Sequence, residues 1–276
     1  MRSPAASLIA VAAAAGLTAS HPAAARDMHE RHIETLWTIS DVDLIESDSS
    51  APADEEGRLV ANDDFVIKQR LLPPTAARLT SAIVDGDGDV LAEAGDELFG
   101  VVSGSGDVYC LDKRPEYNPV GALMVGAIFQ ASCFKDADGD GTFDGGFKKK
   151  LQPSAFPQLR GKHRRNLREI SGGSFEKIDP RALTKVYYVG IEFDGRGFLA
   201  IGKSRYFRVA FGGEYAKGEL SRWFSTDGDE LPKEMGAEGL GAKWTVLGFE
   251  DGAIRVRVDE PLEQKPFAVS IRVTIR

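Results

Sequence analysis

Short apolar runs, separated by turn residues every few positions, set the strongest limit on how this chain can fold. "KVYYVGIEF" is followed by Asp194-Gly195, and "KWTVLGF" is followed closely by Asp251-Gly252 and then by "AIRVRV". Asp-Gly is typical of tight β-hairpin turns because both residues tolerate positive φ. No long stretch has the period of a helix. The pattern predicts an all-β fold of two small antiparallel domains, each a sandwich or a small barrel.

Changes in composition along the chain predict where these domains begin and end. Residues 26–57 are rich in acidic and small polar residues, and we expect them to be irregular. A β domain is predicted for 58–147, and an antiparallel β domain is predicted for 179–276. Residues 148–178 are interpreted as the linker, because they contain a basic run from Lys148 to Arg168 and then the sequence Ser-Gly-Gly-Ser.

Residues 1–25 have the features of a secretory signal peptide. Arg2 precedes an Ala-rich apolar run, and small residues follow it, ending in Ala23-Ala24-Ala25. We expect cleavage after Ala25, with cleavage after Ser20 as the second choice. The apolar run is too short to span a membrane. The mature chain is therefore expected to be periplasmic or secreted, with no membrane span.

The charge of the chain limits its partners. The formal net charge is -8 at pH 7, which disfavours nucleic acid as a partner. The basic run from Lys148 to Arg168 is the exception to this acidic character. We interpret it as a solvated linker, and the alternative is contact with an anionic envelope surface such as lipopolysaccharide headgroups or acidic polysaccharide.

Cys110 and Cys133 are the two cysteines of the chain. An even number of cysteines in an exported protein predicts a disulfide. Each cysteine ends an apolar run, so pairing of two antiparallel strands would bring them together. Closing this loop is expected to stabilise the protein by roughly 3 kcal/mol in the chain-entropy account.

Motifs for catalysis are weak in this sequence. "GFLAIGKS", from Gly197 to Ser204, matches the phosphate-binding loop pattern, but its middle residues are apolar and no helix follows to bind phosphate. His29, His32 and His163 remain after the predicted signal peptide, and none has the context of a Ser/His/Asp triad. We therefore expect a non-catalytic binding or envelope-associated protein. The alternative is a carboxylate-based hydrolase of envelope polysaccharide, since Asp and Glu are abundant.

The sequence "CFKDADGDGTFDGG" concentrates acidic residues at alternate positions directly after Cys133. Hard cations such as calcium are bound by six to eight oxygen atoms, and Gly141 would allow the sharp bend that such a loop needs. We predict a structural calcium site. The expected ligands are four carboxylates and one backbone carbonyl: Asp136, Asp138, Asp140, Thr142 (through its carbonyl) and Asp144.

The spacing D-x-D-x-D-G-x-x-D resembles the calcium loops of the EF-hand and, more closely, the nine-residue hairpin loops of integrin-type β-propeller repeats. The resemblance covers nine residues, and no second full copy implies a propeller. Phe147 stands at the twelfth position, where an EF-hand has Glu. The resemblance therefore implies modest affinity, on the order of 10⁻⁴ to 10⁻³ M. The alternative interpretation of the segment is a polar hairpin turn.

A second acidic stretch, "DGDGD", is a weaker version of the same pattern. Asp85, Asp87, Asp89 and Glu93 have suitable offsets for a metal site, but Val90 replaces the glycine. We interpret this stretch as a turn and keep a second metal site as the alternative.

Overall fold

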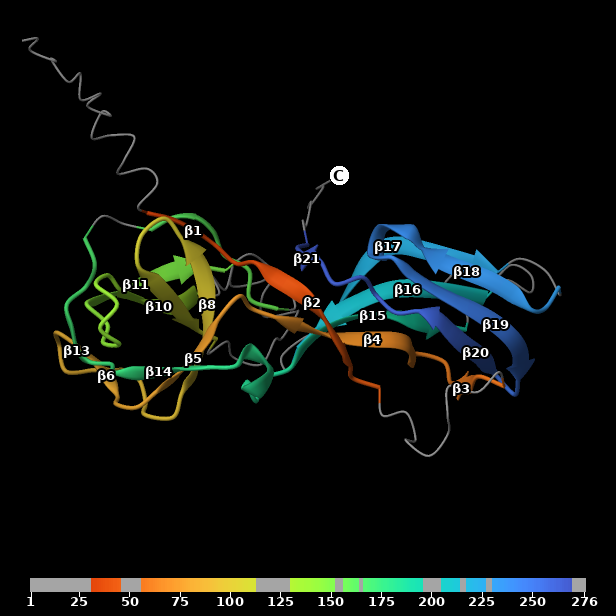
Figure 1. Cartoon of the computed structure of the whole chain (residues 1–276), viewed down its shortest axis with the longest axis horizontal. Helices are drawn as coiled ribbons and strands as arrows, with labels where there is room; N and C mark the ends of the chain where they lie inside the picture. The colour runs from red at the N-terminus through yellow and green to blue at the C-terminus, as the bar shows by residue number, and fades with distance from the viewer. Residues whose placement is uncertain are drawn as a thin grey trace, which may run out of the picture.

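The structure, a computed structural model, is all-β, as the sequence predicts. It describes residues 31–45, 56–112, 130–151, 156–163, 166–195, 205–213, 217–226 and 230–269. Within these ranges there are strands and two single-turn 3₁₀ helices, η1 (Pro180–Ala182) and η2 (Glu238–Leu240), and no α-helix. Figure 1 shows the strands gathered into two lobes along the longest axis of the molecule. The predicted signal peptide lies outside the described residues.

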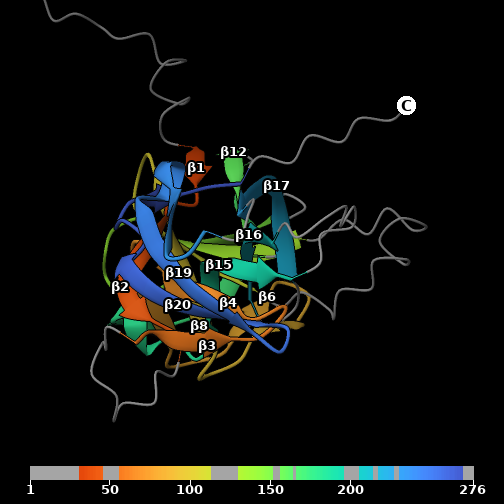
Figure 2. The same ribbon diagram turned by 90° about the vertical axis from the view of Figure 1, so that its right-hand side faces the viewer.

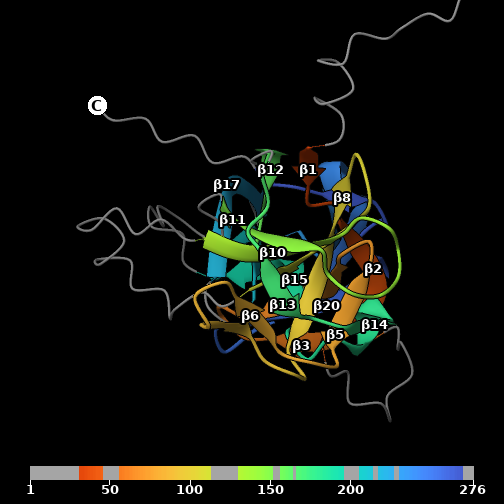
Figure 3. The ribbon, with the colours of Figure 1, turned by 90° about the vertical axis from the view of Figure 1, so that its left-hand side faces the viewer.

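The first lobe is built on a curled antiparallel sheet with the strand order β11-β10-β9-β8-β1-β12. These strands are β11 (Gly145–Lys150), β10 (Gln130–Asp136), β9 (Asp107–Leu111), β8 (Glu97–Ser103), β1 (His32–Glu34) and β12 (Arg160–Lys162). Figure 3 looks onto this lobe and shows β12 beside β1. The two end strands of the sheet approach each other. Lys149 Nζ on β11 donates a hydrogen bond of 2.7 Å to the carbonyl of Lys162 on β12.

Shorter strands extend the first lobe. β5 (Ala76–Leu79) pairs with β8 and with β14 (Phe175–Ile178). A small separate sheet has the order β13-β6-β7, with β13 (Ile170–Gly172), β6 (Ile83–Asp85) and β7 (Val90–Ala92). These strands enclose a second, smaller apolar cluster that includes Tyr109, Phe134 and Phe143.

The second lobe consists of two antiparallel sheets that face each other. The first has the order β17-β16-β15-β4-β2-β21: β17 (Lys217–Thr226), β16 (Arg205–Gly212), β15 (Tyr187–Asp194), β4 (Phe65–Leu72), β2 (Trp37–Asp43) and β21 (Pro266–Phe267). The second has the order β18-β19-β20-β3: β18 (Lys233–Ala237), β19 (Ala242–Glu250), β20 (Ala253–Glu260) and β3 (Arg58–Val60). Figure 2 looks onto this lobe. Phe207 and Trp244 pack across the interface between the sheets with ring centroids 5.3 Å apart.

One hydrophobic core extends through both lobes. Trp37 is 1% exposed and lies at the junction, where its ring contacts Phe99 of the first lobe and Tyr187 of the second. Its indole Nε1 donates a hydrogen bond of 2.7 Å to the carbonyl of Pro157, so the buried donor is satisfied. The lobes are therefore packed together rather than tethered by a linker.

The strand pairing corrects the predicted domain boundaries. Residues 26–57 were expected to be irregular, yet they contain β1 and β2. Residues 148–178 were expected to be a linker, yet they supply the end of β11 and all of β12, β13 and β14 to the first lobe. Within 58–147, β3 and β4 pair with β20 and β15 of the second lobe. Short edge strands have exposed polar side chains, and their composition therefore resembles that of a linker.

Candidate metal centre

The acidic loop connects β10 to β11 at one end of the first lobe. The two strands are paired up to Lys135 and Gly145, so the loop closes a β-hairpin. Asp136 ends β10 and is 1% exposed, whereas Asp138 and Asp144 are exposed. A buried carboxylate thus lies at the base of the loop, below two carboxylates that face solvent.

Backbone amides of the loop hold the buried carboxylate in place. Gly139 N donates to Asp136 Oδ1 at 2.7 Å, and Gly141 N donates to Asp136 Oδ2 at 3.1 Å. The two glycines have φ of +80° and +84°, the left-handed conformation that non-glycine residues rarely adopt. A carboxylate has about four acceptor positions. Each oxygen of Asp136 therefore retains acceptor capacity beyond its amide partner.

Three of the predicted ligands come together. Asp136, Asp138 and Asp144 each offer a carboxylate oxygen, and these atoms lie within 4.8 Å of one another. No other group of three or more His, Cys, Asp or Glu meets this criterion in the part of the chain that the structure describes. Oxygen atoms 2.3–2.6 Å from one calcium ion are at most about 5 Å apart. The spacing of the three carboxylates therefore fits a single divalent cation.

Asp140 is not part of this group. The group consists of carboxylates alone, so the expected carbonyl ligand of Thr142 stays a prediction. Asp140 is exposed, and its Oδ1 accepts a hydrogen bond of 2.7 Å from Thr142 N. Thr142 is exposed and forms an isolated β-bridge with Ser174. The side chain of Asp140 thus stabilises the turn locally, and the carboxylate cluster is narrower than the sequence predicts.

An aromatic residue within the polar loop anchors it to the lobe. Phe143 is 4% exposed, and its ring stacks on Phe175 of β14 with centroids 4.5 Å apart. Phe143 N donates to the carbonyl of Gly173, and Phe175 N donates to the carbonyl of Gly141. Sequence reasoning missed this contact, although a single Phe between Thr142 and Asp144 was a visible signal. The shape of the loop is therefore coupled to β14.

The second acidic stretch forms a hydrogen-bonded turn between β6 and β7. Asp85 Oδ1 accepts from Asp87 N at 3.1 Å and from Asp89 N at 3.0 Å. Glu93 belongs to a different turn, where its amide donates to Asp96 Oδ2. These contacts support the interpretation of the stretch as a turn.

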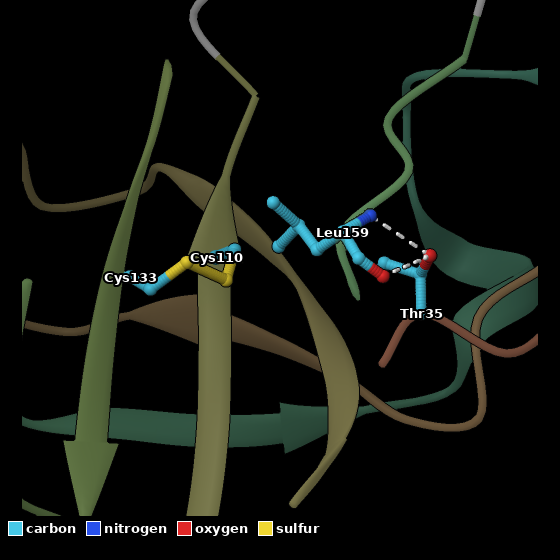
Figure 4. Close-up of a disulfide and its surroundings, with 4 residues drawn as sticks. All are labelled: Thr35, Cys110, Cys133 and Leu159. Carbon is cyan, nitrogen blue, oxygen red and sulfur yellow. Dashed lines mark hydrogen bonds between the residues drawn. A yellow bond between two sulfur atoms is a disulfide. The ribbon is translucent and has the colours of Figure 1, made fainter. Parts of the chain in front are cut away.

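The predicted disulfide is present. Cys110 on β9 and Cys133 on β10 occupy directly paired positions, with an S–S distance of 2.05 Å. Figure 4 shows the bond between the two strands, near the hydrogen bonds that join Thr35 and Leu159. Both cysteines are fully buried. The bond therefore fixes the strand that leads into the acidic loop.

A second group of charges, which sequence reasoning did not predict, lies on β15, β16 and β17. Glu192 is fully buried, with Lys217 Nζ 2.5 Å from its Oε2 and Arg208 Nη2 2.7 Å from its Oε1. Arg208 Nη1 also lies 3.3 Å from Asp194 Oδ2. Burial alone would lower the pKa of Arg208, but the carboxylates of Glu192, Glu219 and Asp194 together outweigh burial and raise it. These pairs stabilise the outer face of the sheet.

Two acidic residues lie beside a cavity of the first lobe and bear on the alternative of a hydrolase. A cavity of about 390 Å³ is lined in part by Asp96 and Glu97. Burial would raise the pKa of Glu97, but hydrogen bonds from Thr184 and Arg78 outweigh it and lower the pKa. Glycoside hydrolysis needs a carboxyl group that stays protonated near neutral pH. Glu97 is therefore unsuited to act as the general acid.

Two further observations bear on function. No helix in the described part of the chain is long and apolar enough to cross a membrane. No protein family, no curated protein and no solved structure matches the chain.

Proposed function

We propose that the chain is an exported, non-catalytic β protein, a binding or envelope-associated module whose first lobe is stabilised by calcium at the acidic loop. The observation that carries this proposal is the clustering of Asp138 and Asp144 around the buried carboxylate of Asp136. All the candidate donors are oxygen atoms, which favour hard cations over zinc or copper. The predicted signal peptide and the disulfide support export.

The role of the ion is structural in this proposal. Three carboxylates within 4.8 Å of one another repel each other when ionised, and a cation between them removes that penalty. Because Phe143 and the backbone of Gly141 contact the β13–β14 segment, ordering the loop also orders that segment. Calcium binding would thereby stabilise the first lobe without taking part in any reaction.

Thermal unfolding with and without calcium tests the proposal. At about ten times a dissociation constant of 10⁻⁴ to 10⁻³ M, binding adds about 1.4 kcal/mol to the free energy of unfolding. For a chain of this size that corresponds to a rise in Tm of about 3–6 °C. Magnesium should give a smaller rise, because it requires shorter bonds and retains its water ligands.

Matched variants separate an ion site from a polar turn. Asp138→Asn removes one charge and keeps the side-chain oxygen that accepts from Asp140 N, so it should abolish most of the calcium-dependent rise. Asp87→Asn makes the same change in the other acidic turn and should leave the rise intact. Equal melting of wild type in chelator and in excess calcium would refute the proposal. The same conclusion would follow if Asp138→Asn responded like wild type.

A further inference from the structure

The two end strands of the first lobe carry four exposed basic side chains. Lys148 and Lys150 lie on β11, and Arg160 and Lys162 lie on β12. We call these four residues the basic seam. Arg164 and Arg165, which belong to the same basic run in the sequence, lie outside the described residues.

Contacts between β11 and β12 place the two halves of the basic seam next to each other. Lys149, between the two seam lysines of β11, donates a hydrogen bond of 2.7 Å to the carbonyl of Lys162. The rings of Phe147 and His163 stack with centroids 4.6 Å apart. Burial lowers the pKa of Lys149, consistent with its position between the strands. The two halves of the seam thus lie on strands that contact each other, although they are separated in sequence.

The charge of the seam is largely uncompensated. Within the described residues, Lys148, Lys150 and Lys162 form no ion pair, and Arg160 lies 3.6 Å from half-buried Glu34. Lysines elsewhere on the surface do have carboxylate partners at 2.6–2.9 Å: Lys177 with Asp107, Lys243 with Glu260, and Lys265 with Glu263. A chain of net charge -8 therefore carries three lysines without carboxylate partners on these two strands.

The seam lies on two strands, and its two β11 lysines are regularly spaced. Lys148 and Lys150 are two positions apart on a strand, which separates their Cα atoms by about 7 Å on the same face. They are paired with Ser132 and Gln130 of β10, so the neighbouring strand supplies no acidic side chain at those positions. Such a surface complements a polymer that carries repeated negative charges.

We propose that the basic seam binds an anionic polysaccharide through the carboxylate, sulfate or phosphate groups of the polymer. A lipid surface fits less well, because membrane-binding surfaces add exposed aromatic anchors to their charge. The one aromatic residue of β11, Phe147, is buried against His163. The choice of polysaccharide over nucleic acid rests on the proposed export of the protein, but the binding itself does not require calcium.

Binding to chondroitin sulfate, measured by calorimetry at low salt and in the presence of a chelator, tests this inference. The triple variant Lys148→Gln, Lys150→Gln and Lys162→Gln should bind roughly 10- to 100-fold more weakly than wild type. The slope of log K against log salt should fall by about two units, at roughly 0.7 per cation removed. The control triple variant Lys177→Gln, Lys243→Gln and Lys265→Gln makes the same change in net charge and should bind like wild type.

Several outcomes would overturn the inference. It is wrong if wild type does not bind chondroitin sulfate, or if the seam variant and the control variant lose the same affinity. Stronger binding to vesicles of anionic phospholipid than to the polysaccharide would assign the seam to a membrane instead. The calcium proposal fails separately, through an unchanged Tm, so each proposal can be refuted without the other. Thermal melts of both triple variants check that they remain folded.

Discussion

Replacement of Arg208 by Met is expected to destabilise the second lobe strongly, because it removes one of two cations that hold a buried carboxylate. Glu192 has no exposed surface, and the side chain of Arg208 is 14% exposed. Met preserves much of the apolar stem of Arg and removes its charge and donors. Glu192 would then be paired with Lys217 alone.

The magnitude follows from the burial of the pair. Removing one partner of a buried ion pair costs about 3–5 kcal/mol, because the other charge stays buried. Since Lys217 remains, with its side chain 38% exposed, we expect the lower end of this range. A loss of about 3 kcal/mol corresponds to a fall in Tm of about 6–12 °C for a chain of this size.

A double-mutant cycle distinguishes this charge effect from lost packing. Urea unfolding of wild type, Arg208→Met, Glu192→Gln and the double variant gives the four free energies of unfolding. Glu192→Gln removes the stranded charge, so the double variant should lose less than the sum of the single losses, by about 0.5–3 kcal/mol. In the double variant, the neutral side chains of Met at position 208 and Gln at position 192 would replace the ion pair in the sheet.

A surface pair serves as the control for this cycle. Arg255→Met breaks the exposed contact with Glu250 and should leave the free energy of unfolding unchanged within error. Two results would refute the reasoning: an Arg208→Met variant as stable as Arg255→Met, or single losses that add up without coupling. Either would mean that Glu192 is not held chiefly by charge.

Two further perturbations have defined outcomes. Replacing Cys110 and Cys133 by Ala should lower the free energy of unfolding by about 3 kcal/mol, because the bond closes a sequence separation of 23 residues; equal urea midpoints for variant and wild type would contradict this. The pKa of Glu97 lies below its ordinary value of 4.5, chiefly because hydrogen bonds from Thr184 outweigh burial. Its contribution to stability is thus present above about pH 4.5 and is lost as pH falls through the folded pKa. Glu97→Gln should be less stable than wild type at pH 7, and the difference should shrink below pH 4.5 in pH-dependent urea titrations.

The local part of the fold was predictable from the sequence. The turn at Asp251-Gly252 joins β19 to β20, with φ of 41° and 87° at these residues. The paired cysteines also followed from local pattern and compartment. The hairpin turn depends on the conformational preferences of a few neighbouring residues, which can be read from the sequence. Pairing between distant segments, such as β1 with β12, leaves no comparable signal in three-residue strands.

The candidate metal site was predictable in position but not in detail. Spacing alone assigned equal roles to the four aspartates of the loop. The structure separates them, because Asp140 lies outside the group of clustered carboxylates and Asp136 is buried at the base of the loop. The charges around Glu192 were missed because Glu192 and Arg208 become neighbours only through the register of β15 with β16. Sequence spacing does not encode that register directly.

Strands from the N-terminal part of the chain pair with strands from its C-terminal part, and this pairing determines when each can fold. β4 at residues 65–72 is hydrogen-bonded to β15 at 187–194, and β2 at 37–43 is hydrogen-bonded to β21 at 266–267. During synthesis from the N-terminus, β2 and β4 can pair only with each other until β15 and β21 have followed. Their apolar side chains, including Val66 and Leu71, stay exposed over that interval, which invites aggregation. A fragment that ended at residue 178 would retain β2 and β4 without the sheet that covers them. Neither lobe is therefore expected to fold without the rest of the chain.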